Sequence, residues 1–180
     1  MTHAQLVHAI RAACNVSGDD ELLIFGSQAI HGSFPDPPAS LTTSVEVDIQ
    51  PKNHPEKTID IDGALGEGSP FHSDWGFYVH GVLIENAVLP TGWEKRCAPV
   101  FSGDAIERTG WCVETHDLAA SKLVAFRDKD RQFVRTLLAE QLVSAGLLES
   151  RVHQLELSAD QRESLLRWLR ITVEDLVEDE

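Results

Sequence analysis

Apolar residues at the start of the chain form two different patterns. Leu6, Ile10 and Ala13 recur at helical spacing and predict an amphipathic helix over residues 3–14. The uninterrupted apolar run 22–25 is instead typical of a short buried strand. A helix followed by a strand therefore opens the chain, an order that favours folds in which both elements pack together.

A second strand is indicated by strict alternation in the segment TSVEVDIQP. Val45, Val47 and Ile49 would share one face of this strand, and Glu46 and Asp48 the other, because successive side chains of a strand point to opposite sides. We expect the aliphatic face to lie against the core. The acidic face is then left for solvent or for a ligand.

The remainder of the first half mixes short elements. A helix is predicted over 54–65, and paired strands broken near Gly81 are predicted over 76–89. Further short strands and turns follow in the segments 89–103 and 106–116.

The second half changes character, because its apolar residues recur only at helical intervals. Thr115 or Asp117 can cap the first helix, Gly146 can close a later one, and a last helix is predicted over 160–177. The sequence thus predicts an α+β fold. Its mixed-sheet core with flanking helices would span residues 1–113, followed by a helical subdomain packed on it over residues 114–180.

The net charge of the chain limits the kinds of molecule that it can bind over a broad surface. The 180 residues carry a formal net charge of −14, while hydrophobic residues make up 42% and charged residues 24% of the chain. Phosphate binding over a wide surface needs clustered Lys and Arg, so a broad nucleic-acid-binding face is disfavoured. A local basic cleft, or an acidic site that reaches phosphates through a metal ion, remains compatible with this charge.

The three cysteines, Cys14, Cys97 and Cys112, are few and widely spaced. This pattern argues against a disulfide partner and against a Cys-rich zinc site. The N-terminal segment lacks the continuous apolar core of a signal peptide, and no apolar run approaches the roughly 18 residues of a membrane span. We therefore expect a cytoplasmic protein without a membrane partner.

The stretch IFGSQAIHG is the first candidate for chemistry. Gly26 can adopt backbone conformations closed to other residues, and Ser27 is a good N-cap for a helix that begins there. A strand, a Gly-Ser turn and a helix would present free backbone N–H groups to a phosphate. A purely conformational role for the turn is the alternative.

The acidic pair is the second candidate. Glu46 and Asp48 would project side by side from one strand face, where two like charges repel by about 1 kcal/mol or more unless a positive group lies between them. A divalent cation is the usual remedy, and Mg²⁺ takes one or two carboxylates together with phosphate oxygens. The alternative is that both acids simply face water.

These motifs, in this order, resemble those of the nucleotidyltransferase-fold superfamily. The chain reads IFGSQAIHG and then TSVEVDI, in which Glu46 lies nineteen residues beyond Ser27. The segment HDLAASKLVAFRDKDRQFVRTLL adds a Lys followed by an Arg-x-Lys-Asp cluster, as in AbiEii-like and MenT-like toxin nucleotidyltransferases. The segments LGEGSPFH and LPTGWEKR are similar to a related bacterial branch whose members mostly lack an assigned role. The resemblance covers most of residues 20–140.

The resemblance implies nucleotidyl transfer with Mg²⁺ (or Mn²⁺) as cofactor and a nucleoside triphosphate as substrate. Gly26 and Ser27 would hold the triphosphate, and Glu46 and Asp48 would bind the metal. The motif residues of the second half would complete the site: Lys122 toward the triphosphate, Asp130 as the later motif acid, and Arg127 and Lys129 as nearby donors.

Without the resemblance, the sequence supports a site role for the motif residues of the second half less strongly than for those of the first half. Lys122 and Lys129 would share one face if a single helix continued through both. The run from Arg127 to Arg131 could equally be a solvated stretch with ion pairs between successive turns.

A third carboxylate, which this fold commonly uses on a later strand, is not evident. Asp74 and Glu85 are candidates by position, whereas the related branch would place Leu83 where an acid is expected. The absence of that acid would mean altered metal geometry or lost activity. The eight histidines show no H-x-x-x-H spacing, so a zinc site is disfavoured, and His80 or His116 could instead line a nucleotide cleft.

The leading hypothesis is therefore transfer of a nucleotide to an RNA or protein acceptor, with tRNA among the acceptors. The resemblance adds a role as the toxin of a toxin–antitoxin or phage-defence system, with a cognate antitoxin as partner. One alternative is a non-catalytic nucleotide-binding or interaction module. Another is nucleotidyl transfer to a small molecule such as a cationic antibiotic, which the acidic composition favours.

Overall fold

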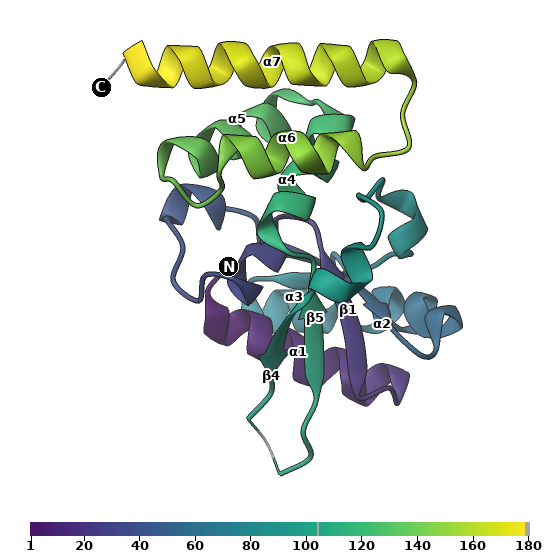
Figure 1. The fold of residues 1–180 in the computed structure, drawn as a ribbon. Helices are drawn as coiled ribbons and strands as arrows, with labels where there is room; N and C mark the ends of the chain where they lie inside the picture. The colour runs from purple at the N-terminus through teal and green to yellow at the C-terminus, as the bar shows by residue number, and fades with distance from the viewer. Residues whose placement is uncertain (104, 179–180) are drawn as a thin grey trace. The chain divides into compact units, whose positions relative to one another are not determined.

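The computed structural model describes residues 1–103 and 105–178 (Figure 1). The chain forms two compact units. The first comprises residues 1–86 and 96–114, and the second comprises residues 87–95 and 115–180.

The first unit is built on a mixed sheet, which confirms the predicted α+β class with flanking helices. Within the described residues, five strands pair in the order β3-β2-β1-β5-β4. Strand β1 is antiparallel to β2 and parallel to β5, β2 is parallel to β3, and β4 is antiparallel to β5. The strands are β1 (Glu21–Phe25), β2 (Glu46–Pro51), β3 (Tyr78–Gly81), β4 (Ala98–Phe101) and β5 (Thr109–Cys112).

Three α-helices pack around this sheet, namely α1 (His3–Ser17), α2 (Thr58–Leu65) and α3 (Pro70–Trp75). Helix α1 contacts β1, β2 and β3, while α2 contacts both β3 and α1, so α1 and α2 cover the same face. A capping box between Thr2 and Gln5 starts α1, and Gly18 in the left-handed conformation ends it. Apolar side chains of α1 and the central strands form the core of this unit.

Several short 3-10 segments replace elements that the sequence predicts differently. Ser27–Gly32 (η1) is a 3-10 helix and not an α-helix, and Ser27 is its first residue with Gly26 in the N-cap position. The predicted strand pair over 76–89 is wrong beyond β3, because Ile84–Asn86 (η4) forms a 3-10 turn. The other 3-10 segments are η2 (Ala39–Leu41), η3 (Pro55–Lys57) and η5 (Trp93–Arg96).

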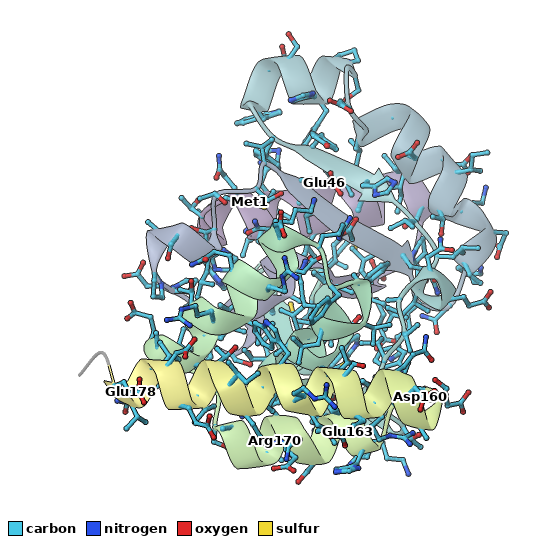
Figure 2. The ribbon with its side chains drawn as sticks, turned by 90° about the horizontal axis from the view of Figure 1, so that it is seen from above. Met1, Glu46, Asp160, Glu163, Arg170 and Glu178 are labelled. Carbon is cyan, nitrogen blue, oxygen red and sulfur yellow. The ribbon has the colours of Figure 1, made fainter. Side chains whose placement is uncertain are left out.

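The second unit contains the helices α4 (Thr115–Ala125), α5 (Asp128–Ala139), α6 (Ala145–His153) and α7 (Ala159–Glu178). Helix α4 packs against α5 and α6, and α7 packs against α5 and α6. On α7, Glu163 and Arg170 pair at 3.0 Å along the helix surface (Figure 2). Across the described part of the chain, no helix is both long enough and apolar enough to cross a bilayer.

Two details of the helical half differ from the sequence prediction. Phe126 has a positive φ of 53° and separates α4 from α5, so Lys122 and Lys129 do not lie on one continuous helix. Gly146 does not close a helix but lies in the first turn of α6, whose N-cap is Ser144.

Candidate functional site

The pairing of β2 with β3 places four polar side chains on one face of the sheet. In the parallel register, Glu46 lies opposite Tyr78, and Asp48 lies opposite His80. Side chains directly opposite one another point to the same face, so these four form a two-by-two array. The intervening Val47 is fully buried on the other face, as its position in the alternation predicts. Val45 is 47% exposed and lies before β2, so its predicted place on the buried face is wrong.

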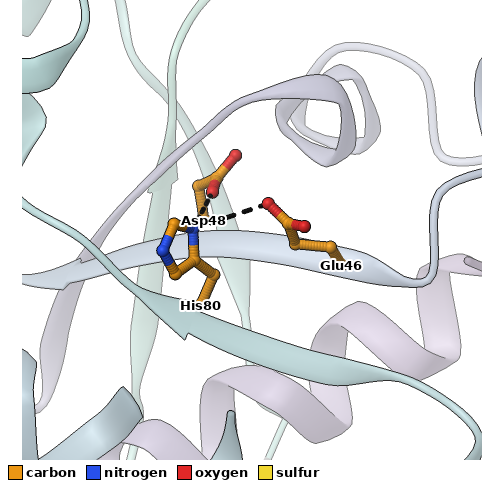
Figure 3. Close-up of side chains that lie close together, drawn as sticks. All are labelled: Glu46, Asp48 and His80. Atoms are coloured by element: carbon orange, nitrogen blue, oxygen red, sulfur yellow. Dashed lines mark hydrogen bonds and ion pairs between the residues drawn. The ribbon is translucent and has the colours of Figure 1, made fainter. Parts of the chain in front are cut away.

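Three members of the array, Glu46, Asp48 and His80, lie close together (Figure 3). Nδ1 of His80 lies 2.9 Å from Oδ1 of Asp48 and 3.5 Å from Oε1 of Glu46. The hydroxyl of Tyr78 donates a hydrogen bond of 2.7 Å to Oε2 of Glu46. The imidazole therefore faces both carboxylates, and the phenol fixes the far oxygen of one of them.

Burial and the hydrogen bonds within the array shift the pKa values of Asp48, Tyr78 and His80. Burial, helped by the neighbouring charge of Glu46 and opposed by the hydrogen bond with His80, raises the pKa of Asp48 to about 6. Burial lowers the pKa of His80, but its hydrogen bond with Asp48 and the two nearby carboxylates outweigh that effect and raise it overall. The hydrogen bond to Glu46 raises the pKa of Tyr78, which keeps the phenol protonated. The array thus concentrates negative charge that a cation can neutralise.

Gly26 brings the Gly-Ser turn against the acidic strand. Phe25, the last residue of β1, lies opposite Asp48 in the antiparallel ladder, and the chain then turns at Gly26 with a φ of 67°. A Cβ at this position would lie 3.0 Å from Cγ of Asp48 and closer still to its Oδ2. Only glycine therefore allows the backbone to pass so near the carboxylate. Ser27 follows at the start of η1.

The donor set fits a divalent cation. Glu46, Asp48 and His80 each offer one ligand atom, and these atoms lie within 4.8 Å of one another. The two carboxylate oxygens suit Mg²⁺ and Mn²⁺ alike, whereas the imidazole nitrogen is a ligand that transition metals bind more readily than Mg²⁺ does. The sequence predicts the two acids at this position but assigns His80 only to the lining of a nucleotide cleft.

The third member of the cluster is His80 on β3, whereas the resemblance leads one to expect a third carboxylate. Leu83, the position that the related branch would match to that acid, lies beyond the end of β3. Among the described residues, neither candidate acid joins the cluster: Asp74 lies on α3 and Glu85 in η4. The sequence feature that could have predicted Tyr78 and His80 as neighbours of the two acids is the matching spacing of E-x-D and Y-x-H. That spacing becomes informative only once β2 and β3 are known to pair in parallel.

The second unit holds a separate cluster of the residues predicted there. Asp130 is buried, with its Oδ1 3.4 Å from Nζ of Lys122 and its Oδ2 2.6 Å from Nε of Arg127. Burial raises the pKa of Asp130, but the hydrogen bond from Arg127 and the charges of both partners lower it overall. Lys129 is exposed in the first turn of α5. The structure thus brings Lys122, Arg127 and Asp130 together, and their roles toward a nucleotide stay predictions.

The chain was compared with known proteins at three levels. Neither a search of curated proteins nor a search of solved structures found a significant match. A family model described as a nucleotidyltransferase of unknown function, DUF6036, matches residues 4–178. This match spans both units and includes all the site residues described above. The chain therefore belongs to the DUF6036 family of nucleotidyltransferases.

Proposed function

We propose that this protein is a metal-dependent nucleotidyltransferase whose site is the array on β2 and β3 beside Gly26. The observation that carries the proposal is the convergence of Glu46, Asp48 and His80 next to Gly26, in a chain of a nucleotidyltransferase family. Two carboxylates beside a Gly-Ser turn suit the binding of a triphosphate together with its cation.

The site residues of the first unit have distinct parts in the proposed reaction. Glu46 and Asp48 hold the divalent cation, which supplies neutralisation of phosphate charge when bound. Gly26 and Ser27 position the triphosphate, because the glycine lets the backbone of the turn lie against Asp48 and Ser27 offers its hydroxyl and its backbone N–H. Tyr78 holds Glu46 in the orientation needed for binding.

The reaction class is an in-line displacement. The oxygen of an acceptor hydroxyl bonds to the α-phosphorus, the bond to the β-phosphate breaks, pyrophosphate leaves, and the hydroxyl proton is released to water. We propose an RNA, such as tRNA, or a protein as acceptor, and a toxin role with a cognate antitoxin, on the strength of the AbiEii-like and MenT-like resemblance. Transfer to a cationic small molecule is the competing acceptor class, favoured by the net charge of −14.

A second candidate function follows from the presence of His80 in the array. Because His80, and not a third carboxylate, completes the cluster with Glu46 and Asp48, the protein could bind nucleotides without transferring them. In that case metal-dependent nucleotide binding would occur without release of pyrophosphate from any acceptor mixture. Pyrophosphate release therefore separates the two functions.

The test is calorimetric binding of each of the four nucleoside triphosphates, with Mg²⁺, with Mn²⁺ and without metal. We expect micromolar, metal-dependent binding by the wild type and its loss in Asp48→Asn. Asp74→Asn is the matched control, since Asp74 is an exposed acid of the same unit outside the array. Failure of all four nucleotides to bind the wild type under any metal condition would refute the proposed function. Acceptor classes are then separated by product analysis with RNA, protein and aminoglycoside.

A further inference from the structure

We propose that His80 is a metal ligand through its imidazole nitrogen, and that this ligand makes the site select Mn²⁺ over Mg²⁺. The inference rests on the proposed function, because it concerns the cation that accompanies the nucleotide at the same site. It goes further in naming a ligand and the ion that this ligand favours.

The position of His80 is that of a ligand and not of a distant partner. Its backbone lies opposite Asp48 in the β2–β3 ladder, so its side chain emerges on the same face of the sheet. Nδ1 then lies 2.9 Å from Oδ1 of Asp48 and 3.5 Å from Oε1 of Glu46. One ligand atom from each of the three groups lies within 4.8 Å of the other two, close enough for one cation to contact all three.

The neighbours of the two acids hold them in place for such a cation. Tyr78 donates to Oε2 of Glu46, which leaves Oε1 on the side of His80. The backbone at Gly26 packs close to Oδ2 of Asp48, while Oδ1 lies toward His80. The carboxylate oxygens nearest the imidazole thus lie on the side where one metal ion would contact both acids and His80. Such outer contacts orient ligands and tune metal affinity.

The chemistry of the nitrogen ligand decides the ion. Mg²⁺ is a hard cation that prefers oxygen ligands and gives up its water reluctantly, whereas imidazole binds transition metals well. Mn²⁺ shares the octahedral oxygen coordination of Mg²⁺ but, as a transition metal, binds an imidazole nitrogen more readily than Mg²⁺ does. A site that has His80 in place of a third carboxylate therefore binds Mg²⁺ less tightly. Its affinity for Mn²⁺ relative to Mg²⁺ is higher.

The experiment measures metal binding directly, without turnover. Mn²⁺ is titrated into the protein while its free electron paramagnetic resonance signal is followed, and Mg²⁺ affinity is obtained by competition. The variants are His80→Asp, which creates a site of three carboxylates, and His80→Gln, which keeps a polar side chain without an imidazole. His72→Gln, on α3, is the matched control. Pulsed resonance of the bound Mn²⁺ reports whether an imidazole ¹⁴N is coordinated.

We expect the ratio of Mn²⁺ to Mg²⁺ affinity to fall by about tenfold or more in His80→Asp, a size typical of changes around a metal site. The imidazole ¹⁴N coupling should vanish in both His80 variants and persist in His72→Gln. An unchanged affinity ratio, or ¹⁴N coupling that survives replacement of His80, would overturn the inference.

The two proposals fail in different ways. If the wild type binds a nucleoside triphosphate together with metal but shows no coupling from His80, the inference falls and the proposed function stands. If the wild type binds neither Mn²⁺ nor any nucleotide, both fall. In either case circular dichroism of His80→Gln shows whether that variant is folded.

Discussion

Asp48 and His80 stand directly opposite each other on neighbouring parallel strands, with Oδ1 and Nδ1 2.9 Å apart. The composition of the site therefore depends on strand register as much as on residue identity. A slip of one residue between β2 and β3 would bring the buried Val79 opposite Asp48. Burial of Val47 and Val79 on the helix-covered face opposes any such slip.

The first prediction concerns the close approach at Gly26. In Gly26→Ala, the added methyl group collides with the carboxylate of Asp48, so we expect metal-dependent nucleotide binding to fall by more than tenfold. The positive φ adds strain of about 1–2 kcal/mol. Calorimetry and urea unfolding measure the two effects separately.

Gly18→Ala is the control for this variant. Gly18 has a φ of 71° and open space around its missing side chain, so its alanine variant should lose only about 1–2 kcal/mol to backbone strain and keep nucleotide binding. Equal nucleotide affinities in Gly26→Ala and the wild type would contradict the assignment of the turn to the site.

The second prediction concerns the phenol that holds Glu46. Tyr78→Phe removes only a hydroxyl group and its 2.7 Å hydrogen bond. We expect Mn²⁺ and Mg²⁺ affinities to fall by about tenfold, because the carboxylate loses its orientation. The free energy of unfolding should change by no more than about 1 kcal/mol. Metal titration checks the prediction, and a variant with unaltered metal affinity would show that Tyr78 does not support the site.

The third prediction concerns pH and the buried carboxylate of Asp19. It accepts hydrogen bonds from the backbone N–H groups of Glu21, Asn53 and His54, and from the side chain of Asn53. Burial raises the pKa of Asp19, but these hydrogen bonds lower it overall. Since the folded pKa lies below the unfolded one, the stabilisation is complete above an ordinary carboxyl pKa of about 4. It is lost as the pH falls through the lower, folded value.

Urea unfolding at pH 7 and at acid pH tests this expectation. Asp19→Ala should lose about 1–3 kcal/mol at pH 7, because it leaves backbone donors unpaired, and the loss should shrink in acid. Asp20→Ala, at an adjacent and mostly exposed acid, is the control and should change stability little. A loss in Asp19→Ala that is independent of pH would contradict the assigned cause.

The fourth prediction concerns a buried ion pair in the second unit. Asp117 is fully buried on α4, and its Oδ1 lies 2.9 Å from Nε of Arg151 on α6. Asp117→Ala leaves the guanidinium with an uncompensated charge, at an expected cost of about 3–5 kcal/mol. The double variant Asp117→Ala/Arg151→Ala should lose less than the sum of the losses in Asp117→Ala and Arg151→Ala. Thermal unfolding of the two single variants and the double variant gives the coupling energy, and additive losses would argue against a pairwise interaction.

The sequence predicts the elements of the site better than their assembly. Local patterns are enough for β1 and for the acidic face of β2, because alternation and apolar runs directly reflect burial. The partner strand is harder, since Tyr78 and His80 reach Glu46 and Asp48 only through a parallel pairing between segments 32 residues apart. Such pairing leaves no local signature.

The break between α4 and α5 escapes prediction for a different reason. Phe126 adopts a positive φ that its own side chain disfavours, so no turn residue marks the boundary. Its ring packs edge-on against Trp168 of α7, and that distant contact helps to hold the conformation. Tertiary packing thus overrides the local preference.

The assignment of residues 87–95 to the second unit has a practical consequence for dissecting this protein. The chain passes between the units at 86–87, 95–96 and 114–115. A fragment ending at residue 113 would still carry Thr91, but without the carbonyl of Gln154 that accepts hydrogen bonds from its backbone N–H and its hydroxyl. To express either unit alone, a designer must excise an internal loop from one and supply it to the other, because no single cut separates them.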